Sequence, residues 1–472
     1  MSDDSFLTDY QLRIGSEDII ERKLHDILSL DLEETEKQDK VQKALVELLK
    51  EMRVRFGTIL KTDNVSFLLG AGVSLNVGGL SLANIPKALE KALLDKASGE
   101  QEGEVIPEWI MLFYKIVSAL SKSDYFFEDR SELFQSSDEK DIEAIGLNLE
   151  TCLCQMHTWH AGMLDATETL KMGGDVKLTI VKSHLVCLIS EITDSLVKLL
   201  ELPKEGKDAP LYYHRKFIKK ILTRPLNLRR VNLFTLNYDT MIEQAGDSEG
   251  TILVDGFVGT LRRVFRPESY DIDFYFPAQT TEGRVHRFDR ALHLYKLHGS
   301  ITWQSCEPDW ENPFGLYATF YNQACHTGDT MIYPTPLKHG QALGMPYSEL
   351  FRRFGNAIAR SQSVLFVIGY AFGDEHVNAM IQQALAIPSF TLVVVDPEPK
   401  SDFVEKLEEL KDERVWIIKG WELGTFECFV ERLLPDLREE EINIKVMKTF
   451  KGLILSSSLE PEDVKDGDSD DK

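Results

Sequence analysis

The feature that most constrains the fold is a buried-strand pattern that ends in Gly70-Ala71-Gly72. Residues 65–69 form a largely apolar run as long as one strand with both faces covered. The glycines can adopt backbone angles closed to other residues and let a pyrophosphate approach the main chain. A helix N-terminus after such a turn attracts the anion. The stretch therefore predicts a strand leading to a phosphate-binding turn, although such turns also occur where only tight packing is needed.

Composition and charge restrict the classes of protein that this chain can belong to. At 472 residues, with 43% hydrophobic content, it has enough sequence for two or three globular domains. The formal charge of −24 disfavours direct nucleic-acid binding. No apolar stretch is long enough for a membrane span, and the first residues do not have the pattern of a signal peptide. We therefore expect a cytoplasmic protein. The six cysteines are scattered and form no CxxC pair, so neither a disulfide framework nor zinc is expected.

The domain organisation follows from the apolar periodicity. Residues 1–60 are expected to form N-terminal helices, one capped by Ser16 and one with Val41, Leu45, Leu48 and Met52 on a single face. Residues 61–455 form the main domain, in which about 86–223 is a helical insertion without strands. The acidic residues 456–472 lack periodicity and are expected to be a disordered tail.

Strand patterns return after the insertion, and each ends in polar or glycine residues. Alternation of strands with helices is typical of a doubly wound, Rossmann-like α/β fold with a mainly parallel sheet, which binds ligands at the carboxyl ends of its strands. The first expected strand begins at Val231 and leads to Asn237-Tyr238-Asp239. The next strands are expected at 292–297, 363–368 and 391–395, and they are followed by His298, Gly369 and Asp396, respectively. A last strand is expected at 415–419.

Three of these strand ends are expected to meet in one crevice. Gly70, Ala71 and Gly72 would receive a diphosphate, Asn237 and Asp239 would add a polar pair, and His298 would add a side chain that titrates near neutral pH. Taken singly, Asn237 to Asp239 could be a helix cap and His298 a hydrogen-bonded turn residue. Together, they predict a dinucleotide site that contains a base.

The same residues carry a resemblance to the sirtuin superfamily. The segments GAGVS at 70–74, TLNYD at 235–239, LHGS at 297–300, GYAFGDEHVN at 369–378 and VVVDPEP at 393–399 resemble its motifs over roughly residues 65–434. The GYAFGDEHVN segment looks like the sirtuin-like domains of bacterial anti-phage defence proteins. The resemblance implies that NAD⁺ is the substrate.

Four departures separate the chain from the sirtuin deacylases. The region after His298 holds Cys306 and Cys325 instead of the two CxxC pairs of a zinc ribbon. A VGGLSLANIP stretch replaces the GIPDFR-like segment, and Leu236 stands where the deacylases have glutamine. The GAG turn and Asn237 are also 237 − 72 = 165 residues apart. We therefore expect an NAD⁺ hydrolase that releases nicotinamide and forms ADP-ribose.

The bond to be cleaved, the positions at strand ends and, for Asp239, the resemblance to sirtuins together imply a role for each site residue. Asn237 would hold the ribose or a water, His298 would act as the base, and Asp239 would orient the nicotinamide. Ser74 and the main chain at 70–72 would face the phosphates, while Gly369 and Asp396 would face the adenosine. A catalytically idle NAD or ADP-ribose sensor and a protein deacylase remain alternatives.

Partners are inferred on two grounds. The N-terminal helices and the insertion offer more apolar faces than one sheet needs, which predicts a homo-oligomer. Because the sequence lacks a GxxxxGK[ST] motif, it has no recognisable ATP-driven sensor of its own. Sirtuin-like proteins of this kind are often encoded beside a HerA-like hexameric ATPase, so we expect such a partner; an Argonaute-like partner and a nucleotide-sensing C-terminal module are the alternatives.

Overall fold

A computed structural model of the chain describes residues 10–438, except 30–33, 82, 100–105, 137–140, 147, 173–175, 205–208, 277–285 and 320–345. The expected tail at 456–472 and Cys325 therefore lie outside the described residues. Among the helices of the described part, none is long and apolar enough to cross a membrane.

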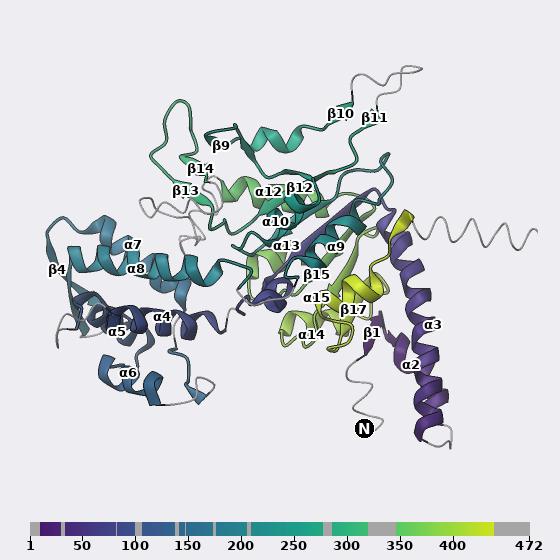
Figure 1. The fold of residues 1–472 in the computed structure, drawn as a ribbon, viewed down its shortest axis with the longest axis horizontal. Helices are drawn as coiled ribbons and strands as arrows, with labels where there is room; N and C mark the ends of the chain where they lie inside the picture. Colours follow the sequence, from purple (N-terminus) through teal and green to yellow (C-terminus); the bar gives the residue numbers. More distant parts are fainter. Residues whose placement is uncertain are drawn as a thin grey trace, which may run out of the picture.

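The centre of the molecule is a nine-stranded, mostly parallel sheet, which confirms the expected α/β, Rossmann-like class (Figure 1). The strand order is β2-β1-β17-β16-β15-β3-β6-β12-β7. The parallel strands are β3 (Asn64–Leu69), β6 (Asn232–Thr235), β7 (Ile252–Val254), β12 (Ala291–Lys296), β15 (Ser363–Ile368), β16 (Thr391–Val395) and β17 (Val415–Lys419).

The position of β3 decides where a ligand can bind. From β3, the chain adds β6, β7 and β12 on one side, and then crosses to add β15, β16 and β17 on the other. Strand β3 is thus the topological switch point, outside whose carboxyl end open α/β sheets bind their ligands. The Gly70-Ala71-Gly72 turn follows β3 directly and leads into the short 3-10 helix η1 (Ala71–Val77).

Helices cover both faces of the sheet, as the fully buried strands β3 and β15 require. Side chains alternate across β3: Phe67 and Leu69 belong to one core, and Leu68 belongs to the other. The first core includes side chains of α2 (Ile19–Leu28), α3 (Glu34–Leu60), α9 (Tyr212–Ile221), α10 (Met241–Ser248) and the π-helical turn η5 (Phe429–Leu433), which continues α15 (Phe426–Cys428). The second includes side chains of α12 (Tyr347–Ile358), α13 (Glu375–Leu385) and α14 (Asp402–Glu409).

The N-terminal segment differs from its prediction. Residues 11–14 form strand β1, which pairs antiparallel with β17 and is followed by β2 (Glu17–Asp18). The cap of α2 is Asp18 rather than Ser16, since the Asp18 carboxylate accepts hydrogen bonds from the N–H groups of Ile20 and Glu21. The amphipathic face predicted in α3 is buried: Val41, Leu45, Leu48 and Met52 are at most 6% exposed.

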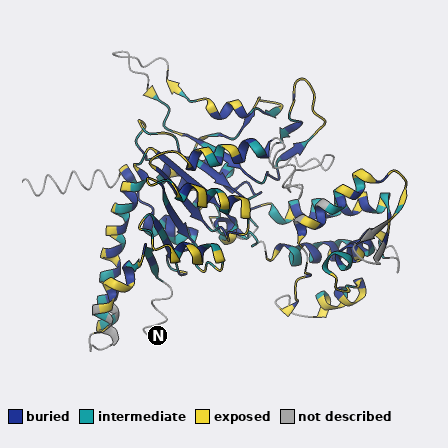
Figure 2. Cartoon of the chain, turned by 180° about the vertical axis from the view of Figure 1, so that it is seen from behind, coloured by how far each residue is buried: buried dark blue, intermediate teal, exposed yellow. Residues whose placement is uncertain are grey.

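The insertion forms a lobe beside the sheet with its own core (Figure 1). Its helices are α4 (Ile85–Gly99), α5 (Glu108–Ser121), α6 (Phe127–Ser136), α7 (Leu149–Gly162) and α8 (Lys182–Leu200). The expectation that no strand interrupts them is wrong, because β4 (Thr167–Met172) pairs with β5 (Val176–Val181). Inside the lobe, Arg130 binds the fully buried Glu90 through two hydrogen bonds of 2.6 Å. Figure 2 shows the buried side of these helices facing the lobe interior.

Short strands that follow β7 in the chain form two small sheets outside the main sheet. A four-stranded sheet has the order β13-β14-β9-β8, and β10 pairs with β11. Their bounds, with that of the short helix η3, are β8 (Phe257–Val258), β9 (Arg263–Phe265), η3 (Pro267–Asp271), β10 (Tyr275–Phe276), β11 (His286–Arg287), β13 (Trp303–Ser305) and β14 (Leu316–Ala318). Phe257, Phe265 and Trp303 pack with the second core of the main sheet.

Candidate functional site

The Gly-Ala-Gly turn packs directly against the end of β15. The Gly72 N–H donates to the carbonyl of Gly369 at 2.9 Å. A Cβ atom on Gly70 would lie 2.4 Å from the Gly369 carbonyl oxygen, and one on Gly72 would lie 2.6 Å from the Gly369 Cα. Of the three glycines, only Gly369 has a positive φ, of 61°. The glycines of the turn are therefore required by this close approach between strand ends, rather than by unusual backbone angles.

A hydrogen-bond network joins the turn to Asn237 and Asp239. The Asn237 amide nitrogen donates to the Gly70 carbonyl at 2.9 Å and to Ser74 Oγ at 3.4 Å. Ser74 Oγ donates to Asp239 Oδ2 at 2.8 Å. Both amide hydrogens of Asn237 are thus engaged, and its Oδ1 oxygen is left as the group that can accept a hydrogen bond from a ligand.

Asp239 bonds to the start of α10, as the helix-cap interpretation predicted, and it also bonds to Ser74. Its Oδ1 accepts from the N–H of Met241 at 3.0 Å, at the start of α10, while Oδ2 binds Ser74. With both oxygens engaged and the residue only 9% exposed, Asp239 organises the turn. A direct contact of Asp239 with nicotinamide stays a prediction.

His298 follows β12, the neighbour of β6, and faces Asp374. Its Nε2 lies 3.2 Å from Asp374 Oδ2. The His298 ring is also 6.3 Å from the rings of Tyr238 and Phe351, measured between centroids. The loop after His298 is tied to the Asn237 loop, because the Ile301 N–H donates to the Tyr238 carbonyl at 3.1 Å. The predicted base and the predicted polar pair thus belong to adjoining, hydrogen-bonded strand ends.

The insertion lobe reaches the same place. Tyr238, between Asn237 and Asp239, and Ile301, three residues after His298, are members of the lobe's hydrophobic core. The site loops are therefore held between the sheet on one side and the lobe on the other, so a change of lobe packing would act directly on them.

The remaining predicted residues lie at the ends of the next two strands. Gly369 directly follows β15 and contacts the Gly-Ala-Gly turn. Asp396 directly follows β16; its Oδ1 accepts from the N–H of Glu398 at 2.9 Å, and burial raises the pKa of its carboxyl group. Their contact with adenosine stays a prediction.

Sequence reasoning missed two residues of this site. Lys296, in β12, is 2% exposed; its ammonium group donates to the main-chain carbonyls of Tyr238 and Asp239 and to Glu243 Oε1 at 2.8 Å. The sequence feature that could have identified Lys296 is the presence of a lysine within an apolar strand. Asp374 stood within the GYAFGDEHVN segment, but nothing in the sequence linked it to His298.

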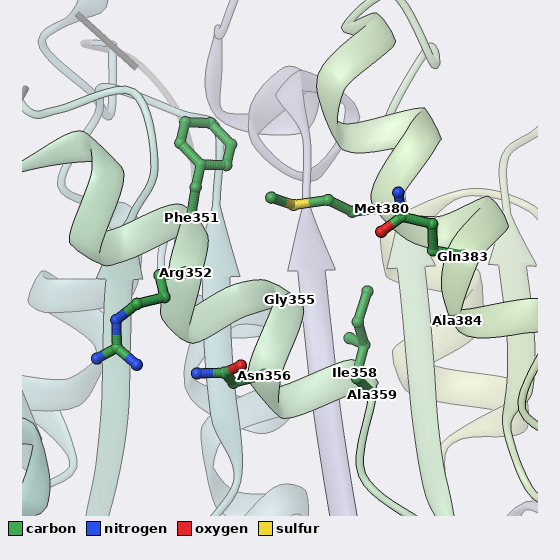
Figure 3. A pocket seen from close by; sticks show the side chains of 9 residues that line it. All are labelled: Phe351, Arg352, Gly355, Asn356, Ile358, Ala359, Met380, Gln383 and Ala384. Atoms are coloured by element: carbon green, nitrogen blue, oxygen red, sulfur yellow. The ribbon is translucent and has the colours of Figure 1, made fainter. Parts of the chain in front are cut away.

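A groove of about 330 Å³ lies elsewhere, between α12 and α13 (Figure 3). Phe351 stands at one end of it and also contacts the ring of His376, at 5.0 Å between centroids. The lining contains no residue of the Gly-Ala-Gly turn, nor Asn237 or His298; it comprises Phe351, Arg352, Gly355, Asn356, Ile358, Ala359, Met380, Gln383 and Ala384.

The comparison with known families agrees with this geometry. Residues 231–418 match the family model of the SIR2-like domain, a class whose members are generally NAD-consuming enzymes. The matched span contains Asn237, Asp239, His298 and Asp396. Strand β3 lies outside the span in sequence, but in the structure it lies between β6 and β15, which are both inside the span. The similarity to a SIR2-like domain thus covers residues 231–418 and suggests an NAD-related activity. No curated protein matches the chain.

Within the described ranges, no group of three or more His, Cys, Asp or Glu side chains is placed to hold a metal ion. Cys306, the first cysteine after His298, is an exposed free thiol. The absence of zinc stays a prediction, which metal analysis of the purified protein tests.

Proposed function

We propose that this protein is an NAD⁺ glycohydrolase that releases nicotinamide and forms ADP-ribose. The observation that carries the proposal is the hydrogen-bonded set of Gly70, Ser74, Asn237 and Asp239 at the switch point, with His298 on the adjoining strand end. Cleavage of the nicotinamide bond develops positive charge on the ribose. The enzyme must therefore hold the sugar and supply a base.

The chain's own residues meet these needs. The main chain at Gly70 to Gly72 offers an approach for the diphosphate, and Asn237 presents Oδ1 to a ribose hydroxyl or to the attacking water. His298 takes the proton, a function typically worth about 10²–10⁴-fold in rate. Asp239 acts on the substrate through Ser74 and the start of α10.

We further propose that the enzyme is the NAD-depleting effector of an anti-phage defence system and acts as a homo-oligomer with a HerA-like hexameric ATPase. Support comes from the resemblance of the GYAFGDEHVN segment and from the formal charge of −24, which disfavours direct contact with DNA. Recognition of nucleic acid would then fall to the partner. The lobe, which packs on Tyr238 and Ile301, gives a binding partner a route to the site.

Product analysis tests the activity. The purified protein, alone and with the ATPase, is incubated with NAD⁺ in the absence of any acyl-lysine peptide, and the products are separated by chromatography. Equal amounts of nicotinamide and ADP-ribose are expected. Binding of NAD⁺ or ADP-ribose without turnover in either arm would favour the sensor, and turnover only with an acylated peptide would favour the deacylase.

Three further measurements test zinc content, assembly and the need for the ATPase. Metal analysis is expected to find no stoichiometric zinc, and one tightly held zinc per chain would restore the deacylase. Light scattering at micromolar concentration is expected to show an oligomer, so a monodisperse monomer would contradict that proposal. An isolated chain that is fully active and fully protective in cells would contradict the need for the ATPase.

A further inference from the structure

Asp374 uses its two carboxylate oxygens for two different purposes. Its Oδ1 caps α13, accepting from the N–H groups of His376 at 2.9 Å and Val377 at 3.4 Å. Its Oδ2 lies 3.2 Å from Nε2 of His298, 76 residues away in the sequence. A helix cap needs only one of these oxygens. The second oxygen therefore has a separate function.

The loop before Asp374 is built to fix this position. Tyr370 Oη accepts from the Asp374 N–H at 2.9 Å, and the Asn378 amide donates to the Phe372 carbonyl at 2.8 Å. Phe372 has a φ of 54°, an uncommon conformation for a residue other than glycine. Local strain of this kind persists only where the surroundings determine it, as they do around functional groups.

The pair is shielded from water. The side chains of His298 and Asp374 are 11% and 12% exposed. His298 Nδ1 has no hydrogen-bond partner among the described residues. A carboxylate that accepts from one imidazole nitrogen fixes the proton there and leaves the other nitrogen with its lone pair.

We propose that Asp374 is a positioning residue for His298: it accepts from Nε2–H and thereby makes Nδ1 the nitrogen that receives the proton during the reaction. This inference rests on the proposed hydrolysis. The bond between the ribose C1′ and the nicotinamide nitrogen breaks, and its electron pair leaves with nicotinamide. The water oxygen bonds to C1′, one water proton passes to Nδ1 of His298, and that proton is later released to solvent.

The variant Asp374→Asn separates capping from positioning. Asparagine caps helices as well as aspartate does, so its Oδ1 retains the bonds to α13. Its amide then faces Nε2 as a donor, which favours the tautomer with the proton on Nδ1. We expect kcat to fall by at least about 10²-fold with little change in KM, since the base is lost while the substrate contacts remain.

Asp18→Asn is the matched control. Asp18 caps α2 through the same type of bond, with Oδ1 accepting from Ile20 at 2.9 Å and Glu21 at 3.1 Å, and it lies on the far edge of the sheet. This variant should keep the unmutated kcat, while both variants should show similar small changes in stability. Asp374→Asn with the unmutated kcat, or with a loss that only follows a loss of folded protein, would overturn the proposal.

A second readout does not need turnover. Nitrogen NMR of protein labelled in histidine, with the His298 signals assigned from His298→Ala, reports which ring nitrogen carries the proton. The proposal predicts the proton on Nε2 in the unmutated protein at mildly alkaline pH and on Nδ1 in Asp374→Asn. A proton on Nδ1 in the unmutated protein would overturn it even if NAD⁺ hydrolysis is confirmed, and the expected spectra would support it even if hydrolysis is not found.

Discussion

Ser74 donates a 2.8 Å hydrogen bond to Asp239 across 165 residues of sequence. The bond fastens the turn after β3 to the loop after β6 at the switch point of the sheet. Ser74 and Asp239 are 3% and 9% exposed, so neither partner can exchange this bond freely for water. This one contact therefore couples the phosphate-binding turn to the loop that carries Asn237.

Ser74→Ala should weaken both stability and turnover. The substitution leaves Asp239 Oδ2 buried without its donor, at a cost of roughly 1–3 kcal/mol in the free energy of unfolding. Chemical denaturation measures this cost, and Ser98→Ala is the control because Ser98 only bonds back to Leu94 within α4. Equal stability of the two variants would show that the Ser74 bond does not hold the site together.

Gly72→Ala should destabilise the fold before it affects NAD⁺ affinity. The added Cβ would meet the Gly369 Cα at 2.6 Å, a main-chain contact that cannot rotate away, so the β3 and β15 ends must separate. Gly99→Ala is the control, since a Cβ there meets no atom within 4 Å. Thermal melting compares the two variants. If Gly72→Ala has the same melting temperature as the unmutated protein but binds NAD⁺ more weakly, then Gly72 is needed for ligand binding and not for the packing of the strand ends.

Lys296→Met should disorder the Asn237 loop. Removing this buried cation frees the Tyr238 and Asp239 carbonyls and leaves Glu243 without its partner. Because the Glu243 side chain is 26% exposed, the loss should be about 3 kcal/mol, the lower end of the range for one member of a buried pair. The double variant Lys296→Met, Glu243→Gln should regain part of that loss, as a double-mutant cycle in denaturant would measure. Additive losses would mean that the two side chains do not interact.

The protein should lose stability as the pH falls from about 6.5 to about 4. His214 is fully buried beside Phe426, and burial lowers its pKa to about 4, while the charge of Asp239 opposes this shift. The folded state resists protonation that the unfolded chain accepts below about pH 6.5, a difference of roughly 3 kcal/mol once the pH is well below 4.

The contribution of His214 to the pH dependence of stability is measured by unfolding the unmutated protein and His214→Gln in denaturant at a series of pH values. The variant should keep the smaller dependence that arises from other groups, including His293, whose pKa burial also lowers to about 4. An unchanged slope in His214→Gln would show that His214 does not titrate on unfolding.

The sequence predicted the fold where one signal dominated. Strands β15, β16 and β17 begin and end where expected, because each is a continuous apolar run between polar residues. Strand β1 was missed because Gln11–Ile14 carries only two apolar residues and gains its place by pairing with β17, some 400 positions later. The hairpin β4–β5 was missed although Gly173-Gly174-Asp175 between alternating strands is a turn signal.

The location of the site could be predicted from the sequence, but the contacts between its residues could not. Gly-Ala-Gly, Asn237 and His298 follow strands, and parallel strands bring their carboxyl ends together. Which side chain bonds to which depends on strand order, and β15 lies beside β3 only because the chain crosses over. The contact of Gly72 with Gly369 and that of His298 with Asp374 could therefore not be predicted from spacing.

The most direct test of the proposed reaction is the rate of NAD⁺ hydrolysis by His298→Ala and Asn237→Ala, measured with the activating partner if one is required. Each should be at least about 10²-fold slower than the unmutated protein, and the double variant should lose little more, because both groups serve one transition state. Both should keep the unmutated circular dichroism spectrum. A folded His298→Ala protein that hydrolyses NAD⁺ at the unmutated rate would contradict the assignment.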